Sequence, residues 1–178
     1  MTSRIPSAHF IAIIFLLISF ETSASTTHLE AHEHGSANLN IAVDGATLFL
    51  GFESPAINII GFEHAAENDQ QTAAINSATT KLKNFEQVFK LPESAGCKPT
   101  SATANWISEL EEGSNTAGHT EFKAEYQLSC EQIERLAYID VQLFELFPGI
   151  EDLDVQVISV GKQFAIELNP GQQRIELK

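Results

Sequence analysis

The feature that most constrains the fold is an alternation of apolar and polar residues that recurs along the chain. A period of two places successive side chains on opposite faces of a β-strand, so each such segment predicts a strand with one buried and one solvated face. The alternating segments are residues 37–43, 122–130, 153–157 and 164–168. A returning strand is expected over residues 48–52, because it follows Asp44-Gly45, a dipeptide typical of tight hairpins. The pattern therefore predicts a domain rich in antiparallel sheet.

One helical segment interrupts this pattern. Apolar residues recur at helical spacing between residues 69 and 89, Asn68 and Gln71 resemble a capping box, and Pro92 marks the end. Spacings of three and four residues line up on one face of a helix, so one long helix over residues 69–89 is predicted. Its apolar stripe consists of Ala74, Ala78, Leu82, Phe85 and Phe89.

Shorter elements fill the remaining chain. A break is expected at Ser54-Pro55, followed by an apolar strand over residues 57–62, and later by a strand over 138–143 and a helical turn over 144–147. Strands and one long helix without a regular alternation of β and α indicate the α+β class. Residues 35–178 have a length that suits one domain. We therefore expect a single α+β domain of mainly antiparallel sheet.

Residues 1–24 show the three zones of a secretory signal peptide. Arg4 stands in a short polar start, an apolar run covers residues 10–20, and the small residues Thr22-Ser23-Ala24 follow. The apolar run is only about half of the roughly 20 residues that a membrane-spanning helix needs, so cleavage after Ala24 and no membrane anchor are expected. The protein is thus predicted to be exported and soluble, with a flexible polar arm at residues 25–34.

The two cysteines, Cys97 and Cys130, are expected to form a disulfide, because an even pair in an exported chain meets an oxidising compartment. The alternation places Cys130 on the buried face of its strand, so the bond would tie the end of the helix to that strand. Restricting the unfolded chain in this way would stabilise the fold by roughly 3 to 4 kcal/mol. The alternative is that both thiolates bind a metal.

The formal net charge of −14 at pH 7 limits the possible partners. A field of this sign repels phosphates and gathers cations, so nucleic acid is not expected as a partner. The sequence contains no His-Glu-x-x-His metalloprotease motif, no nucleophile elbow, no glycine-rich phosphate loop and no Cys-x-x-Cys. We therefore expect a binding protein and not an enzyme.

The strongest indication of function is a cluster of histidines just before the predicted domain. His28, His32 and His34 lie close together in the arm. His32 and His34, two residues apart, project from the same side of an extended segment, and imidazole is a common zinc ligand. Cleavage after Ser25 would instead leave His28 third from the new N-terminus, where it could bind Cu²⁺ or Ni²⁺ in a square-planar site. The alternative is a solvated polar arm.

Two further histidines are candidates for completing a metal site. His64 is expected at the corner between the apolar strand and the helix, beside Glu63. The alternation places His119 on the solvated face of its strand, with Glu121 and Glu125. A tetrahedral zinc ion needs four ligands, so the arm and the corner could share one ion. The alternative for His64 is a local contact with the backbone at the helix entry.

Several short motifs stand in a fixed order along the chain. They are His32-Glu33-His34-Gly35, Ser54-Pro55-Ala56, Gly61-Phe62-Glu63-His64-Ala65, Ala95-Gly96-Cys97, His119-Thr120-Glu121-Phe122 and Leu143-Phe144-Glu145-Leu146-Phe147-Pro148-Gly149. In this order they resemble the ZrgA family of periplasmic zinc-uptake proteins over essentially the whole chain after the signal peptide. The resemblance implies a Gram-negative periplasmic protein that binds Zn²⁺ and assists its import beside an ABC-type zinc transporter.

The resemblance also names candidate ligands, because the matching histidines are His32, His34, His64 and His119. One departure is that members of the family often have a long His- and Asp-rich loop before the position of His119. Here residues 109–118 contain acids and small residues but no histidine. A capacity to collect many zinc ions is therefore not expected.

We thus expect a periplasmic zinc-binding accessory protein in which His32 and His34 close over a site that includes His64, with Glu63 or His119. Neutral imidazole is the form that binds metal, so zinc affinity is expected to fall as the pH drops through about 6.5, the ordinary pKa of a free imidazole. The alternative is a periplasmic interaction module that binds another protein and whose histidines are incidental.

Overall fold

The computed structural model describes residues 34–110, 117–159 and 161–177. The predicted signal peptide, His28 and His32 lie outside the described residues. In chain order the elements are β1 (Ser36–Asp44), β2 (Thr47–Pro55), α1 (Ala56–Ile60), α2 (Asp69–Lys83), α3 (Phe85–Val88), β3 (Phe89–Lys90), η1 (Glu93–Ala95), β4 (Cys97–Leu110), β5 (Ala117–Cys130), η2 (Ile133–Arg135), β6 (Tyr138–Val141), α4 (Leu143–Leu146), β7 (Asp152–Ser159), β8 (Lys162–Leu168) and β9 (Arg174–Glu176).

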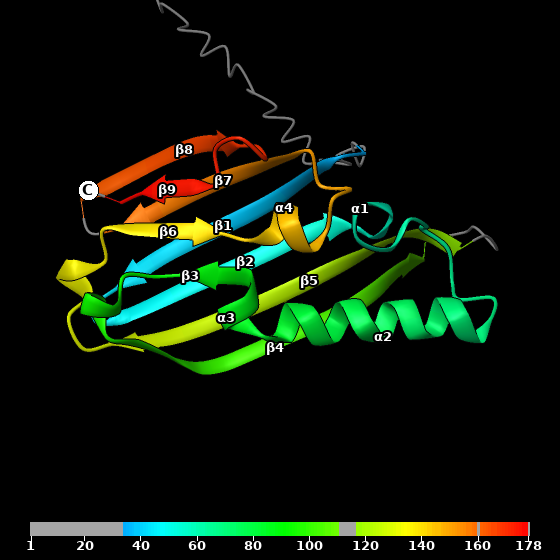
Figure 1. The fold of residues 1–178 in the computed structure, drawn as a ribbon, viewed down its shortest axis with the longest axis horizontal. Helices are drawn as coiled ribbons and strands as arrows, with labels where there is room; N and C mark the ends of the chain where they lie inside the picture. The colour runs from blue at the N-terminus through cyan, green and yellow to red at the C-terminus, as the bar shows by residue number, and fades with distance from the viewer. Residues whose placement is uncertain (1–33, 111–116, 160, 178) are drawn as a thin grey trace, which may run out of the picture. The chain divides into compact units, whose positions relative to one another are not determined.

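Six strands form one large sheet in the order β4-β5-β2-β1-β7-β8 (Figure 1). Every neighbouring pair is antiparallel except β1 and β7, which run parallel. A parallel pair requires a crossover connection, and the chain between β1 and β7 includes all the helices of the described residues. The mainly antiparallel sheet predicted from the alternation is therefore confirmed.

The β1–β2 hairpin follows directly from its sequence. Ala37, Leu39 and Ile41 face the core and are at most 2% exposed, as their alternation predicts. The chain reverses at Gly45, whose φ of +55° lies in the left-handed region that glycine adopts without strain. The hairpin fixes the position of the start of β1, which leads into the candidate site.

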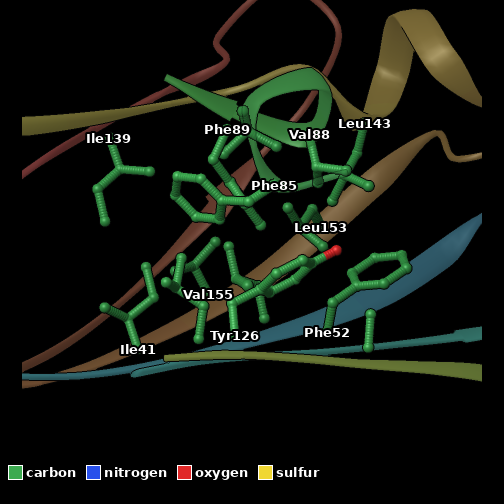
Figure 2. Packing of buried hydrophobic residues seen from close by; sticks show 14 of the residues in the cluster. Ile41, Phe52, Phe85, Val88, Phe89, Tyr126, Ile139, Leu143, Leu153 and Val155 are labelled. Carbon is green, nitrogen blue, oxygen red and sulfur yellow. The ribbon is translucent and has the colours of Figure 1, made fainter. Parts of the chain in front are cut away.

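The helices and a small three-stranded sheet, β3-β6-β9, lie on one side of the large sheet (Figure 1). The core lies between these two layers. Figure 2 shows Phe85 and Phe89 above Tyr126 of β5, and the two ring centroids are 5.6 and 5.5 Å from that of Tyr126. The Tyr126 hydroxyl donates a hydrogen bond to the Leu82 carbonyl at the end of α2, which links the helical layer to the sheet.

The long helix predicted over residues 69–89 is shorter in the structure. Its start is confirmed, because the Asn68 side chain accepts a hydrogen bond from the Gln71 amide at 2.9 Å. The helix ends at Lys83, however, and Asn84 is extended before the short helix α3. Phe85 and Phe89, which the sequence placed on one face of the long helix, both still pack against Tyr126.

The predicted end of the strand at Ser54-Pro55 is confirmed, but the strand predicted over residues 57–62 is wrong. β2 ends at Pro55, and residues 56–60 form the helix α1. The φ of proline suits the position before a helix, and Asn58 explains why α1 packs where it does. The buried Asn58 amide accepts a hydrogen bond from the Gly35 amide and donates one to the Ser36 carbonyl, both at 2.8 Å.

The predicted disulfide joins Cys97 and Cys130, with an S–S distance of 2.04 Å. The two residues are direct partners across β4 and β5. The bond therefore ties two neighbouring strands together, and not a helix end to a strand as the sequence suggested. The alternative of two thiolate metal ligands is thus not supported, because neither of these cysteines is free.

β4 was not predicted from the sequence, although it is one of the two longest strands.

Within the ranges that the structure describes, no helix is both long and apolar enough to cross a membrane.

Candidate metal centre

Three parts of the chain meet at one end of the large sheet. β1 and β5 are both antiparallel to β2, so both begin at the end where β2 stops and α1 starts. His34 lies just before β1, His119 lies near the start of β5, and Glu63 follows α1. The topology therefore brings together residues that are far apart in the sequence.

The Glu63 carboxylate stands between the two imidazoles. Its Oε2 atom is 3.0 Å from Nδ1 of His119 and 3.8 Å from Nε2 of His34. The Glu63 side chain is only 15% exposed, whereas the two histidines are 60% and 64% exposed. The carboxylate is thus held inside the site and the imidazoles form its outer rim.

The second oxygen of Glu63 is buried and has no hydrogen-bond partner among the described residues. A buried carboxylate oxygen without a partner is costly, so a bound cation, a water molecule or a hydroxyl group is expected there. Imidazole nitrogen and carboxylate oxygen are ligands that zinc accepts. These three side chains therefore have the chemistry of a zinc site.

The three donors are not arranged as a finished coordination shell. Two ligands of one tetrahedral zinc ion lie about 3.3 Å apart, given bond lengths of about 2.0 to 2.1 Å. Glu63 and His119 fit this spacing, but His34 is farther from Glu63. Across the part of the chain that the structure describes, no three His, Cys, Asp or Glu side chains are placed to hold a metal ion.

Glu121 lies on β5 two residues after His119, and the prediction that it is solvated is wrong. It is buried, with 6% of the residue exposed. Its carboxylate is 2.7 Å from Nζ of Lys123, which also approaches Glu53 at 3.8 Å. Strand parity alone could not show this burial, because parity places Glu121 on the outward face and does not report its neighbours, among them Pro55 on β2.

His64 has contacts of its own in the structure. Its Nδ1 atom is 2.9 Å from the Ala65 carbonyl and 4.0 Å from the Glu67 carboxylate. The imidazole also lies against Phe62, with ring centroids 5.0 Å apart. The structure therefore brings together His34, Glu63 and His119 from the predicted set and gives His64 local partners, while His32 lies outside the described residues.

The fold and this donor cluster define a class of protein: an α+β domain that gathers imidazole and carboxylate groups at one end of a mainly antiparallel sheet. Residues 31–177 match the family described as ZrgA family zinc uptake protein. The chain belongs to this family, as its motifs indicated. No curated protein matches the sequence. The family links the chain to the uptake of zinc.

Proposed function

We propose that the protein is a periplasmic accessory protein that binds Zn²⁺ and assists its import, beside an ABC-type zinc transporter. The observation that carries this proposal is the Glu63 carboxylate between His34 and His119, with a second oxygen that is buried and unpaired among the described residues. Membership of a zinc uptake family supports the choice of metal. The family is one of uptake proteins, which agrees with a role in binding and not in catalysis.

Zinc binding would need only a small rearrangement. The His34 side chain is 64% exposed, so its imidazole has room to turn toward the ion that Glu63 and His119 hold. His32 would supply a fourth ligand from the arm, or water would complete the shell. The overall negative charge of the protein would raise the local concentration of cations near the site.

The test is a calorimetric titration of the mature, disulfide-bonded protein with Zn²⁺. We expect near-stoichiometric binding that weakens at least tenfold in Glu63→Gln and in His119→Ala. Glu63→Gln keeps the shape of the side chain and removes its charge, so it isolates the carboxylate as a ligand.

His64→Ala is the matched control, because it removes a histidine that directly follows Glu63 in the chain. It should bind Zn²⁺ as the wild type does if the site lies at Glu63. Loss of binding in His64→Ala but not in His119→Ala would move the site to the corner that the sequence favoured. Weak binding that none of the three variants changes would contradict the proposal altogether.

A further inference from the structure

The side of the large sheet opposite the helices carries a surface that zinc binding does not explain. We define this open face by the outward residues of β4, β5, β2, β1, β7 and β8. They are mostly exposed, and no described element packs over them. Among the described residues, the two exposed large apolar side chains are Phe49, at 39%, and Ile158, at 54%. Both lie on the open face.

These two side chains stand at one end of a depression. Ala42 of β1 pairs with Phe49 of β2 on one side and with Ile158 of β7 on the other. The small alanine side chain therefore lies between two large apolar side chains on neighbouring strands. The next row contains Gly51, and a Cβ atom added there would meet nothing within 4 Å. The resulting depression has a volume of about 420 Å³.

One carboxylate, that of Glu125, lines this depression, and two more, those of Asp154 and Glu167, lie farther along the open face. Glu125 is the direct partner of Gly51, and Asp154 lies directly opposite Glu167 on the neighbouring strand. Like charges directly opposite each other destabilise a sheet. The ion pairs of the described residues do not include any of these three acids.

The lysines of the same face are already paired with other acids. Lys98 lies 3.2 Å from Glu131, and Lys123 lies 2.7 Å from Glu121. The ion pairs of the described residues therefore leave the carboxylates of Glu125, Asp154 and Glu167 without a cationic partner. An apolar depression with one carboxylate in its lining and two more on the same face is complementary to an apolar side chain flanked by basic ones.

We propose that the open face is a docking surface for a basic segment of a partner protein. An apolar side chain of that segment would lie over Gly51 beside Phe49 and Ile158, and lysines or arginines on either side would pair with Glu125 and with the Asp154–Glu167 pair. A second copy of the chain carries the same charge of −14, and an anionic membrane is likewise repelled, so both fit this surface less well.

The test is photocrosslinking in the cells that make the protein, with the full chain and p-benzoylphenylalanine in place of Phe49. The matched control carries the same probe in place of Ser77, an exposed residue of α2 on the opposite side of the sheet. We expect one dominant protein adduct at position 49 that is at least tenfold weaker at position 77. Mass spectrometry of the adduct should show a segment with net positive charge.

Two further variants in the Phe49-probe protein show what the partner recognises. Gly51→Leu fills the depression, and the open space above Gly51 means that the strand should tolerate it. The triple change Glu125→Gln, Asp154→Asn and Glu167→Gln removes the charge. Each should lower the adduct yield at least tenfold while the melting temperature stays within a few degrees of that of the parent.

The proposal is overturned by an adduct with a second copy of the chain or with lipid, by equal labelling at positions 49 and 77, or by a yield that neither variant changes. The docking surface does not depend on the zinc site. Gly51→Leu should therefore bind Zn²⁺ as the wild type does, and His119→Ala should retain the adduct. Failure of one proposal is thus distinguishable from failure of the other.

Discussion

At the scale of single residues, the proposed zinc site implies that protons and zinc compete for the same three groups. When His34 and His119 are protonated, they can form ion pairs with Glu63 over the 3.8 and 3.0 Å that separate their atoms. When an imidazole is neutral, one of its two nitrogen atoms carries no proton and is available to a metal. Zinc binding should therefore release protons and depend on pH.

The first prediction follows from this competition. Zinc affinity should fall at least tenfold between pH 7.5 and pH 5.5, and the slope of log affinity against pH should be smaller in His119→Ala, because one fewer proton is displaced. Calorimetric titrations at several pH values measure both quantities. An affinity that is the same at pH 7.5 and pH 5.5 would rule out ligation by histidine.

A second residue-scale prediction concerns Tyr126. Burial raises its pKa above the ordinary tyrosine value of about 10, because the charged phenolate is poorly solvated in the core. The unfolded chain loses the phenol proton first as the pH rises through about 10, so the folded state becomes less stable above that pH. We expect a loss of about 1 kcal/mol between pH 9 and pH 11 that Tyr126→Phe does not show.

Urea denaturation at both pH values measures this loss. Tyr126→Phe should also be less stable than the wild type by about 1 kcal/mol at pH 7, since it leaves the Leu82 carbonyl without its donor. Tyr138→Phe is the control, because Tyr138 is the other tyrosine of the chain. If Tyr138→Phe removes the high-pH loss and Tyr126→Phe does not, the effect has been assigned to the wrong residue.

At the scale of elements, α1 positions the site through one side chain. Asn58 holds the backbone of Gly35 and Ser36, and this is the segment that places His34 at the start of β1. Glu63 follows the end of the same helix, where Gly61 has a φ of +81°. Asn58 therefore sets the distance between an imidazole and the carboxylate, although it is not itself a ligand.

The third prediction uses this link. Asn58→Ala leaves a buried N–H and a carbonyl without partners, so it should destabilise the protein by about 2 kcal/mol and weaken zinc binding several-fold. Asn68→Ala removes the cap of α2 and should cost about 1 kcal/mol without changing zinc affinity. Urea denaturation and calorimetry measure the two effects. Equal zinc affinity in both variants would show that α1 does not position the site.

The elements that the sequence predicted well are those whose side chains alternate between large apolar and polar. β5 and β7 follow this pattern, and their inward residues are buried. β4 was missed because its inward positions include Ala102 and Ala104, and small residues give a weak signal. Their alternation up to Trp106 could have revealed the strand, had small residues been counted as apolar.

At the scale of the whole molecule, the order of strands could not be predicted, because strand pairing joins segments far apart in the sequence. The parallel pairing of β1 with β7 has no local signature. The same holds for the candidate site: His119 and Glu63 are 56 residues apart, and only the topology places them side by side. The sequence identified histidines as candidate ligands, but which of them lie together in space depends on the fold.

The donor cluster and the depression occupy different parts of the domain, because none of the residues that line the depression belongs to the cluster, so binding to one need not disturb the other. The candidate zinc site lies at the end where β1 and β5 begin, and the depression lies along the middle of the open face, around Gly51. If both proposals hold, the protein would carry an ion while it is attached to a partner. The two sites can therefore be tested separately in the same molecule.

The last prediction concerns the stability of the whole domain. A ligand that binds only the folded state stabilises it by mass action, and free Zn²⁺ at 100 times its dissociation constant should contribute about 2.7 kcal/mol. For a domain of this size that is a rise of about 5 to 10 °C in melting temperature, reversed by a chelator. Circular dichroism melts of metal-free and zinc-loaded protein measure it.

Gly51→Leu should show the full rise, because it leaves the donor cluster intact, and Glu63→Gln should show little or none. Glu63 matters for this comparison because its carboxylate is mostly buried and lies close to both imidazoles. Its removal should therefore weaken zinc binding more than the loss of any exposed acid. An equal rise in Glu63→Gln would mean that zinc stabilises the domain elsewhere, through its many surface carboxylates, and that the cluster at the end of the sheet is not the site.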